Sequence, residues 1–172
     1  KVLGVIGMGR IGQAIAKRAH FGFGMQVVYH TRTPRPLPAL PVARALPSLH
    51  DVMKAADIVV IAAPASAETR HMIDASALAA LRPHALLVNI ARGDIIDEQA
   101  LIAALQAGQI AGAGLDVYEH EPDVPEALRA LENVVLLPHL GTAALEVRVQ
   151  MGLMALENAL ALRDGRPLPN PV

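Results

Sequence analysis

Short apolar runs rich in β-branched residues alternate along this chain with segments of helical spacing. The runs lie at residues 2–6, 26–30, 58–62, 85–90, 112–117 and 134–137. Runs of this length are typical of strands buried on both faces of a sheet. Apolar residues at helical spacing fall between them, at 11–19, 49–56 and 101–105, and a longer pattern runs over 145–160. The alternation predicts an α/β fold: a Rossmann-type, doubly wound, mainly parallel sheet of about six or seven strands with helices on both faces.

A glycine-rich loop follows the first predicted strand and opens the first predicted helix. Its sequence is Gly7-Met8-Gly9-Arg10-Ile11-Gly12. In such a loop the first glycine permits a tight turn, the second leaves room for a pyrophosphate, and the third lets helix and strand pack closely. The N-terminus of the helix then faces the phosphates. We interpret the loop as a dinucleotide site; the alternative is a tight turn without a ligand.

Composition excludes several classes of function. With 15 Lys+Arg against 16 Asp+Glu and aromatics at 2%, the chain lacks the positive charge and the stacking platforms of nucleic-acid-binding proteins. No apolar run reaches the roughly 18 residues of a membrane span. There is no cysteine, which fits a reducing compartment, and no HxH or HExxH spacing that would suggest a metal site. We therefore expect a soluble, cytoplasmic protein without nucleic-acid, membrane or metal partners.

Three further motifs follow the glycine loop in order. They are Asn-Ile-Ala-Arg-Gly at 89–93, Gly-Leu-Asp-Val-Tyr-Glu-His-Glu-Pro at 114–122 and Pro-His-Leu-Gly-Thr-Ala at 138–143. Together with the glycine loop they resemble the D-2-hydroxyacid dehydrogenase family over nearly the whole chain. Residues 121–126 and 133–139 look most like the glyoxylate and hydroxypyruvate reductase branch. The resemblance implies an enzyme that reduces a small 2-keto acid by hydride transfer from a nicotinamide cofactor.

The same resemblance implies a catalytic trio of Arg92, Glu121 and His139. Histidine is suited to proton donation near neutral pH, and a carboxylate bonded to its ring would favour the imidazolium. The planar guanidinium of an arginine matches a substrate carboxylate. Taken singly, Arg92 could form a salt bridge near a strand end, and Glu121 and His139 could be solvated surface residues. All three follow predicted strands, where ligand crevices form in α/β sheets, and this favours catalysis.

The loop and the resemblance together predict the cofactor contacts. These residues are Gly7, Gly9, Arg10, Ile11, Gly12, Thr31, Arg32, Thr33, Pro64, Thr69, Ala91, Asp116 and Gly141. Asp116 resembles the family residue on the nicotinamide side, although it could instead cap the following turn.

The sequence after the second predicted strand favours NADP(H), with NAD(H) possible. Folds that prefer NAD carry an acidic residue about 20 positions after the glycines. Here residues 30–35 contain no carboxylate, whereas Arg32 and Arg35 could bind a 2′-phosphate with the hydroxyls of Thr31 and Thr33. The alternative is that both arginines are solvated loop charges in an enzyme that accepts either cofactor.

The chain starts with the first strand of the predicted cofactor domain. We therefore expect residues 1–172 to be a dinucleotide-binding domain, with the family's substrate domain absent and the isolated domain nearly inactive. The family resemblance also implies a homodimer. Two other functions remain open: an NAD(H)-sensing regulatory module of the corepressor type, and a structural dinucleotide domain of a different oxidoreductase.

Overall fold

The computed structural model describes residues 1–33 and 36–171. They form two compact units, Lys1–Pro138 and His139–Val172. The strands, all in the first unit, are β1 (Val2–Ile6), β2 (Gln26–His30), β3 (Arg44–Ala45), β4 (Ile58–Ile61), β5 (Leu86–Asn89), β6 (Gly112–Leu115) and β7 (Val134–Leu136). The helices of this unit are α1 (Arg10–Lys17), η1 (Arg18–Gly22), α2 (Leu49–Ala55), α3 (Ala75–Ala79), η2 (Gly93–Ile95), α4 (Glu98–Gln106) and α5 (Glu126–Arg129).

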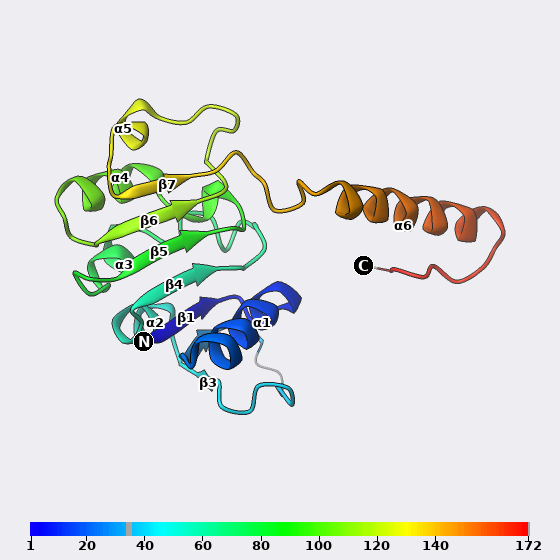
Figure 1. Cartoon of the computed structure of the whole chain (residues 1–172), viewed down its shortest axis with the longest axis horizontal. Coiled ribbons are helices and arrows are strands. Elements are labelled where there is room, and N and C mark those ends of the chain that lie inside the picture. Colours follow the sequence, from blue (N-terminus) through cyan, green and yellow to red (C-terminus); the bar gives the residue numbers. More distant parts are fainter. Residues whose placement is uncertain (34–35, 172) are drawn as a thin grey trace. The chain divides into compact units, whose positions relative to one another are not determined.

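The strands form one parallel sheet in the order β3-β2-β1-β4-β5-β6-β7. The chain leaves β1 towards β2 and β3, and then returns to place β4 on the other side of β1 (Figure 1). This reversal creates a switch point at the carboxyl ends of β1 and β4, where α/β proteins bind ligands. The predicted doubly wound sheet of six or seven strands is confirmed.

Helices cover both faces of the sheet because successive strand residues point to opposite sides. Leu3 and Val5 of β1 belong to one apolar cluster together with Ala16 of α1. Ile6 belongs to the second cluster, which includes Val52 of α2 and residues of α3 and α4. The apolar runs of the sequence thus supply two cores, one on each face, as strands buried on both sides require.

The ends of α4 follow the local sequence signals. The Asp97 carboxylate accepts a hydrogen bond of 3.1 Å from the backbone N–H of Ala100, which caps the first turn. Gly108 has a φ of 63° just after the last turn, in the left-handed region that glycine tolerates. Both ends of α4 therefore carry residues that are typical of helix termini.

Some boundaries differ from the predictions. The α-helix predicted over 11–19 ends at Lys17 and continues as a π-helical turn, Arg18–Gly22. Several strands are one or two residues shorter than their apolar runs, and the short helices α3 and α5 were not predicted. The proline-rich segment at 34–47 contains one short strand among its described residues, β3, while Pro34 and Arg35 lie outside the described residues.

The second unit consists mainly of one helix, α6 (Leu145–Arg163), with Gly165 at a φ of 63° beyond its end. The long helical pattern of the sequence predicted it. Its apolar side chains are largely exposed, including Leu145, Val149 and Leu156. No helix in the part of the chain that the structure describes is long and apolar enough to cross a membrane.

Candidate functional site

The glycine loop joins β1 to α1 at the switch point of the sheet. Gly7 has a φ of 94°, and a Cβ there would lie 2.6 Å from the backbone nitrogen of Ala63. A Cβ at Gly12 would overlap the carbonyl oxygen of Gly7, so this glycine permits close packing of helix and strand. Gly9 differs from both, because a Cβ there would meet no atom of the described residues within 4 Å.

The open space at Gly9 lies at the start of α1. Gly9 is the N-cap residue and has no side chain to bond the first N–H groups of the helix. These N–H groups and the positive end of the helix dipole suit a phosphate. The three glycines therefore match the three roles that a dinucleotide loop requires, and the loop fits a pyrophosphate. The exposed residues Arg10 and Ile11 follow Gly9 directly.

Two neighbouring loops flank the glycine turn. The backbone N–H of Gly7 donates to the carbonyl of His30 at the end of β2, at 2.9 Å, and the N–H of Ala62 after β4 donates to Ile6 at 2.8 Å. Thr31, Arg32 and Thr33, which the sequence predicted as cofactor contacts, therefore leave β2 beside the glycine loop. Arg35, the second arginine expected here, lies outside the described residues.

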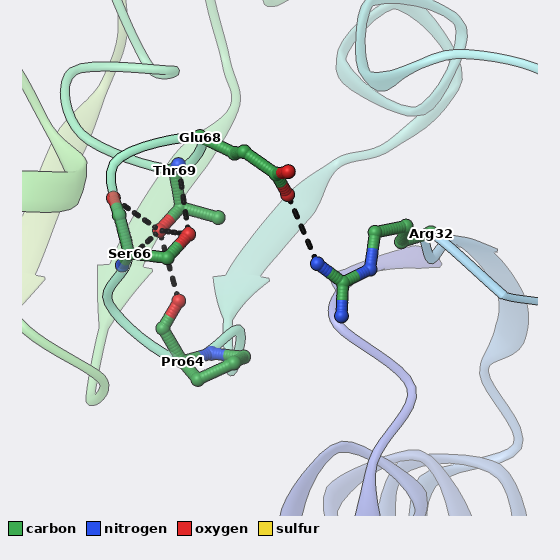
Figure 2. A network of polar contacts seen from close by, with 5 residues as sticks. All are labelled: Arg32, Pro64, Ser66, Glu68 and Thr69. Carbon is green, nitrogen blue, oxygen red and sulfur yellow. Dashed lines mark hydrogen bonds and ion pairs between the residues drawn. The ribbon is translucent and has the colours of Figure 1, made fainter.

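The loop after β4 carries the two other predicted cofactor residues on this side, Pro64 and Thr69. The Thr69 hydroxyl donates to the Pro64 carbonyl at 2.9 Å and accepts from the N–H of Ser66 at 2.8 Å. Glu68 on the same turn meets Arg32, with 2.9 Å between Oε2 and the guanidinium (Figure 2). The two residues are 36 positions apart, and no pattern in the sequence predicted their contact.

A buried asparagine organises the loop after β5. Asn89 is 1% exposed; its side-chain N–H donates to the carbonyl of Arg92 at 2.8 Å, and its Oδ1 accepts from the N–H of Ala91 at 3.0 Å. These bonds fix the turn that carries Arg92, whose side chain is exposed. We did not predict this role, although an amide that ends an apolar strand is a usable signal.

The loop after β6 holds Asp116 and Glu121. Asp116 is buried, and its N–H donates to the carbonyl of Asn89 at 3.0 Å, which joins the ends of β5 and β6. The Glu121 carboxylate accepts from the N–H of Tyr118 at 3.1 Å. The Tyr118 hydroxyl in turn donates to the carbonyl of Leu137, at 2.8 Å, just after β7. Burial raises the pKa of this phenol, which keeps it a neutral donor.

Close packing joins the Arg92 and Glu121 loops. A Cβ at Gly93 would overlap the backbone carbonyl of Tyr118, so only glycine fits there. Glu119 follows Tyr118 directly, and its carboxylate lies 2.8 Å from Nε2 of His71 and 3.4 Å from the guanidinium of Arg70. The structure therefore brings the loops of two predicted catalytic residues together.

A buried carboxyl group supports the same loop from α4. Glu98 is 7% exposed, and its Oε2 accepts a long hydrogen bond, 3.4 Å, from the backbone N–H of Glu119. Desolvation raises the pKa of Glu98, as expected of a carboxyl group inside the protein. This contact spans 21 positions of the chain, and we did not predict it from the sequence.

His139 and Gly141 belong to the second unit. The structure therefore describes them by themselves and does not place them against Arg92 and Glu121. His139 has a φ of 55°, which is uncommon for a residue other than glycine and is found more often at functional sites. Both residues are exposed.

Of the remaining histidines, His120 lies in the loop after β6, between Glu119 and Glu121, and His71 contacts Glu119. His20 and His30 contact backbone carbonyls, at 2.9 and 3.2 Å, and His84 contacts Asp57 at 2.7 Å. Among the described residues, no three His, Asp or Glu side chains form a group able to hold a metal ion.

Comparison with known proteins decides the family. Residues 1–141 match the family described as D-isomer specific 2-hydroxyacid dehydrogenase, NAD binding domain. The chain belongs to this family. The resemblance inferred from the motifs is confirmed, and with it a domain that binds a nicotinamide dinucleotide.

Individual proteins that are similar to this chain agree with the family assignment. A glyoxylate reductase of Thermococcus gammatolerans is 45% identical over 172 residues, covering 100% of this chain and 51% of the relative. The crystal structure of an NADPH-dependent glyoxylate/hydroxypyruvate reductase from Sinorhizobium meliloti, in complex with NADP and malonate, has a TM-score of 0.94 at 42% identity, over 100% of this chain and 53% of that one.

A D-mandelate dehydrogenase from Rhodotorula graminis has a TM-score of 0.95 at 36% identity, over 99% of this chain and 50% of that one. The chain thus spans about half the length of these relatives. Their names favour the reductase interpretation over the regulatory alternative, and those of the first two agree with the glyoxylate and hydroxypyruvate reductase branch.

Proposed function

We propose that this chain is the cofactor domain of an NAD(P)-dependent reductase that converts a small 2-keto acid, glyoxylate or hydroxypyruvate, to the 2-hydroxy acid. The observation that carries the proposal is the glycine loop, with Gly9 open and Gly7 and Gly12 closely packed, beside two braced loops that carry Arg92 and Glu121. The residues that would hold the cofactor are the thirteen predicted from the sequence, of which Gly7 is the first and Gly141 the last.

The proposed chemistry assigns one role to each residue of the trio. When bound, the reduced nicotinamide supplies the hydride for the keto carbon. Arg92 binds the substrate carboxylate and polarises the keto group. Its side chain is exposed on a turn that Asn89 fixes, where the guanidinium donates to the carbonyl of Ala91 at 2.6 Å. His139 donates the proton to the keto oxygen, while Glu121 orients the imidazolium and stabilises its charge.

Substitution of His139 tests this function in the full-length protein. We expect His139→Gln to lower kcat for glyoxylate reduction by about 10² or more with little change in NADPH affinity, because only proton donation is removed. Arg92→Lys should raise KM and lower kcat, since an ammonium cannot form the two-pronged contact. Near-normal turnover in both variants contradicts the proposal.

We further propose a preference for NADP(H). The support is Arg32, which leaves β2 beside the glycine loop, and the absence of a carboxylate from residues 30–35 of the sequence. The Sinorhizobium relative is NADPH-dependent. Arg32→Ala should weaken NADPH binding about tenfold and leave NADH binding unchanged, because a charge-assisted contact to a 2′-phosphate is lost. A wild type that prefers NADH contradicts this assignment.

The oligomeric state and the cellular compartment of the protein are also proposals. We propose a cytoplasmic homodimer, with residues 1–172 as its dinucleotide-binding domain and the substrate domain elsewhere in the full-length protein. The exposed apolar side chains of α6 support an association surface. Sedimentation of the full-length protein at tens of micromolar should give the mass of a dimer; the mass of a monomer contradicts it.

A further inference from the structure

An ion pair joins the two loops that flank the glycine turn. Arg32 follows β2, Glu68 lies in the loop after β4, and the guanidinium and carboxylate are 2.9 Å apart. Figure 2 shows the two side chains pointing towards one another from their separate loops. Because β2 and β4 are the two neighbours of β1 in the sheet, the pair connects the two sides of the glycine turn.

The carboxylate comes from a well-ordered turn. The Ser66 and Thr69 side chains bond each other's backbone N–H groups, at 2.8 and 3.3 Å, and the Thr69 hydroxyl bonds the Pro64 carbonyl at 2.9 Å. Glu68 lies within this braced segment, immediately before Thr69. Its position opposite Arg32 is therefore set by the turn and not by the ion pair alone.

Both partners are well solvated. The side chain of Arg32 is 83% exposed and that of Glu68 is 70% exposed. Exposed pairs of this kind are weak, so a stronger anion can displace the carboxylate at little cost. A phosphate monoester is such an anion, because it carries a charge of about −1.5 to −2 and three acceptor oxygens.

We propose that Glu68 is a specificity-determining residue that competes with the cofactor's 2′-phosphate for Arg32. The inference rests on the proposed role of Arg32 in binding NADP(H). When the 2′-phosphate binds, Arg32 exchanges its carboxylate partner for the phosphate. NADH carries a hydroxyl at this position, cannot displace the carboxylate, and leaves the pair intact. Glu68 therefore lowers the affinity for NADPH but not for NADH, and so reduces the ratio of the two affinities.

Binding of cofactor fragments tests the exchange without any turnover. The probes are 2′,5′-ADP, which carries the 2′-phosphate, and 5′-AMP, which lacks it. Titration calorimetry on the full-length protein compares wild type with Glu68→Gln, which keeps the length of the side chain and removes its charge. We expect Glu68→Gln to tighten 2′,5′-ADP about threefold, the size of one exposed ion pair, and to leave 5′-AMP unchanged.

The double variant Arg32→Ala/Glu68→Gln identifies the route of the effect. If Glu68 acts through Arg32, the double variant binds 2′,5′-ADP as Arg32→Ala does. Glu132→Gln is the matched control: it removes one exposed carboxylate just before β7, at the opposite edge of the sheet, and should change neither affinity.

The outcomes distinguish the role of Glu68 from the proposed binding of NADP(H) by Arg32. If Arg32→Ala weakens 2′,5′-ADP selectively but Glu68→Gln has no effect, the competition is overturned and the NADP(H) assignment stands. An equal gain from Glu68→Gln in both backgrounds also overturns it, because the carboxylate then repels the phosphate directly. If Arg32→Ala leaves 2′,5′-ADP binding unchanged, both ideas fail.

Discussion

At the carboxyl edge of the sheet, the loops after β1, β2 and β4 present exposed groups, whereas the loops after β5 and β6 rest on buried ones. The first set, here called the glycine-loop half, offers Gly9 with open space around it and Arg32 in a solvated pair. The second set, the β5–β6 half, holds Arg92 and Glu121 through Asn89, Gly93 and Tyr118.

The difference follows from what each half has to do. Phosphate binding depends on backbone N–H groups and charge, which tolerate water and can be adjusted by one exposed residue. Hydride and proton transfer depend on the placement of side chains to within a fraction of an ångström. We therefore expect substitutions in the glycine-loop half to change cofactor affinity, and those in the β5–β6 half to change stability and kcat together.

The largest expected contrast is between two glycines. Gly93→Ala should lower the free energy of unfolding by about 3 kcal/mol, because the added Cβ overlaps the Tyr118 carbonyl and must separate the two loops. Gly9→Ala should change it by less than about 0.5 kcal/mol, since its Cβ enters open space, yet it should weaken NADPH binding. Denaturant unfolding and cofactor titration of both variants measure this, and equal stabilities contradict the comparison.

A smaller contrast involves two polar anchors. Asn89→Ala should cost about 2 kcal/mol, because it leaves the Ala91 N–H and the Arg92 carbonyl without their partner inside the protein. Thr69→Val in the other half should cost only about 0.5 kcal/mol, since its partners lie near water. The keto-acid KM should rise in Asn89→Ala alone. A normal KM in that variant shows that Asn89 does not position Arg92.

Removal of one hydroxyl gives a smaller effect still. Tyr118→Phe should cost about 1 kcal/mol, because the carbonyl of Leu137 loses its donor while the ring stays packed. Arg32→Ala, its counterpart in the exposed half, should alter thermal stability by no more than about 0.5 kcal/mol. If Arg32→Ala is the more destabilising of the two, the exposed pair is structural and the contrast between the halves is wrong.

The sequence predicted the glycine-loop half better than the β5–β6 half for a physical reason. Gly7, Gly9 and Gly12 lie in one short segment, so their spacing indicates their roles, although Gly7 also packs against the backbone of Ala63 after β4. Gly93 matters because Tyr118, 25 positions away, packs on it, and Glu119 is held by His71 from 48 positions away. Such contacts form only when the sheet brings β4, β5 and β6 together. The Arg32–Glu68 pair was missed for the same reason.

The predictions of the fold differ in the same way, depending on whether an element is specified by local pattern or by long-range packing. Apolar runs and helical spacing predicted six of the strands and the four longer helices, because these patterns act over a few residues. The short helices α3 and α5 escaped prediction, since five and four residues carry too little periodicity. Their places are set by packing, as the complete burial of Leu78 and Leu128 shows.

The last contrast concerns the amino-terminal edge of the sheet, where Asp57 anchors the start of β1. Asp57, before β4, accepts from the N–H of Val2 at 2.8 Å and lies 2.7 Å from His84 and 3.4 Å from Arg82. The hydrogen bond from His84, followed by that from Val2, lowers the pKa of Asp57 from 3.8 to about 2.

A carboxyl group whose pKa is lower in the folded state stabilises the fold above its unfolded pKa. That stability is lost as the pH falls from 3.8 to about 2, while the unfolded chain takes up a proton that the folded one still excludes. Asp57→Asn should therefore lower the melting temperature at pH 7 and flatten its decline through this acid range. Because Asp57 contacts the start of β1, hydrogen exchange at Val2 should quicken in the variant while exchange at Tyr118, in the β5–β6 half, keeps its rate. Equal acceleration at both amides would show that the two halves open as one unit and that their different anchors do not make them independent.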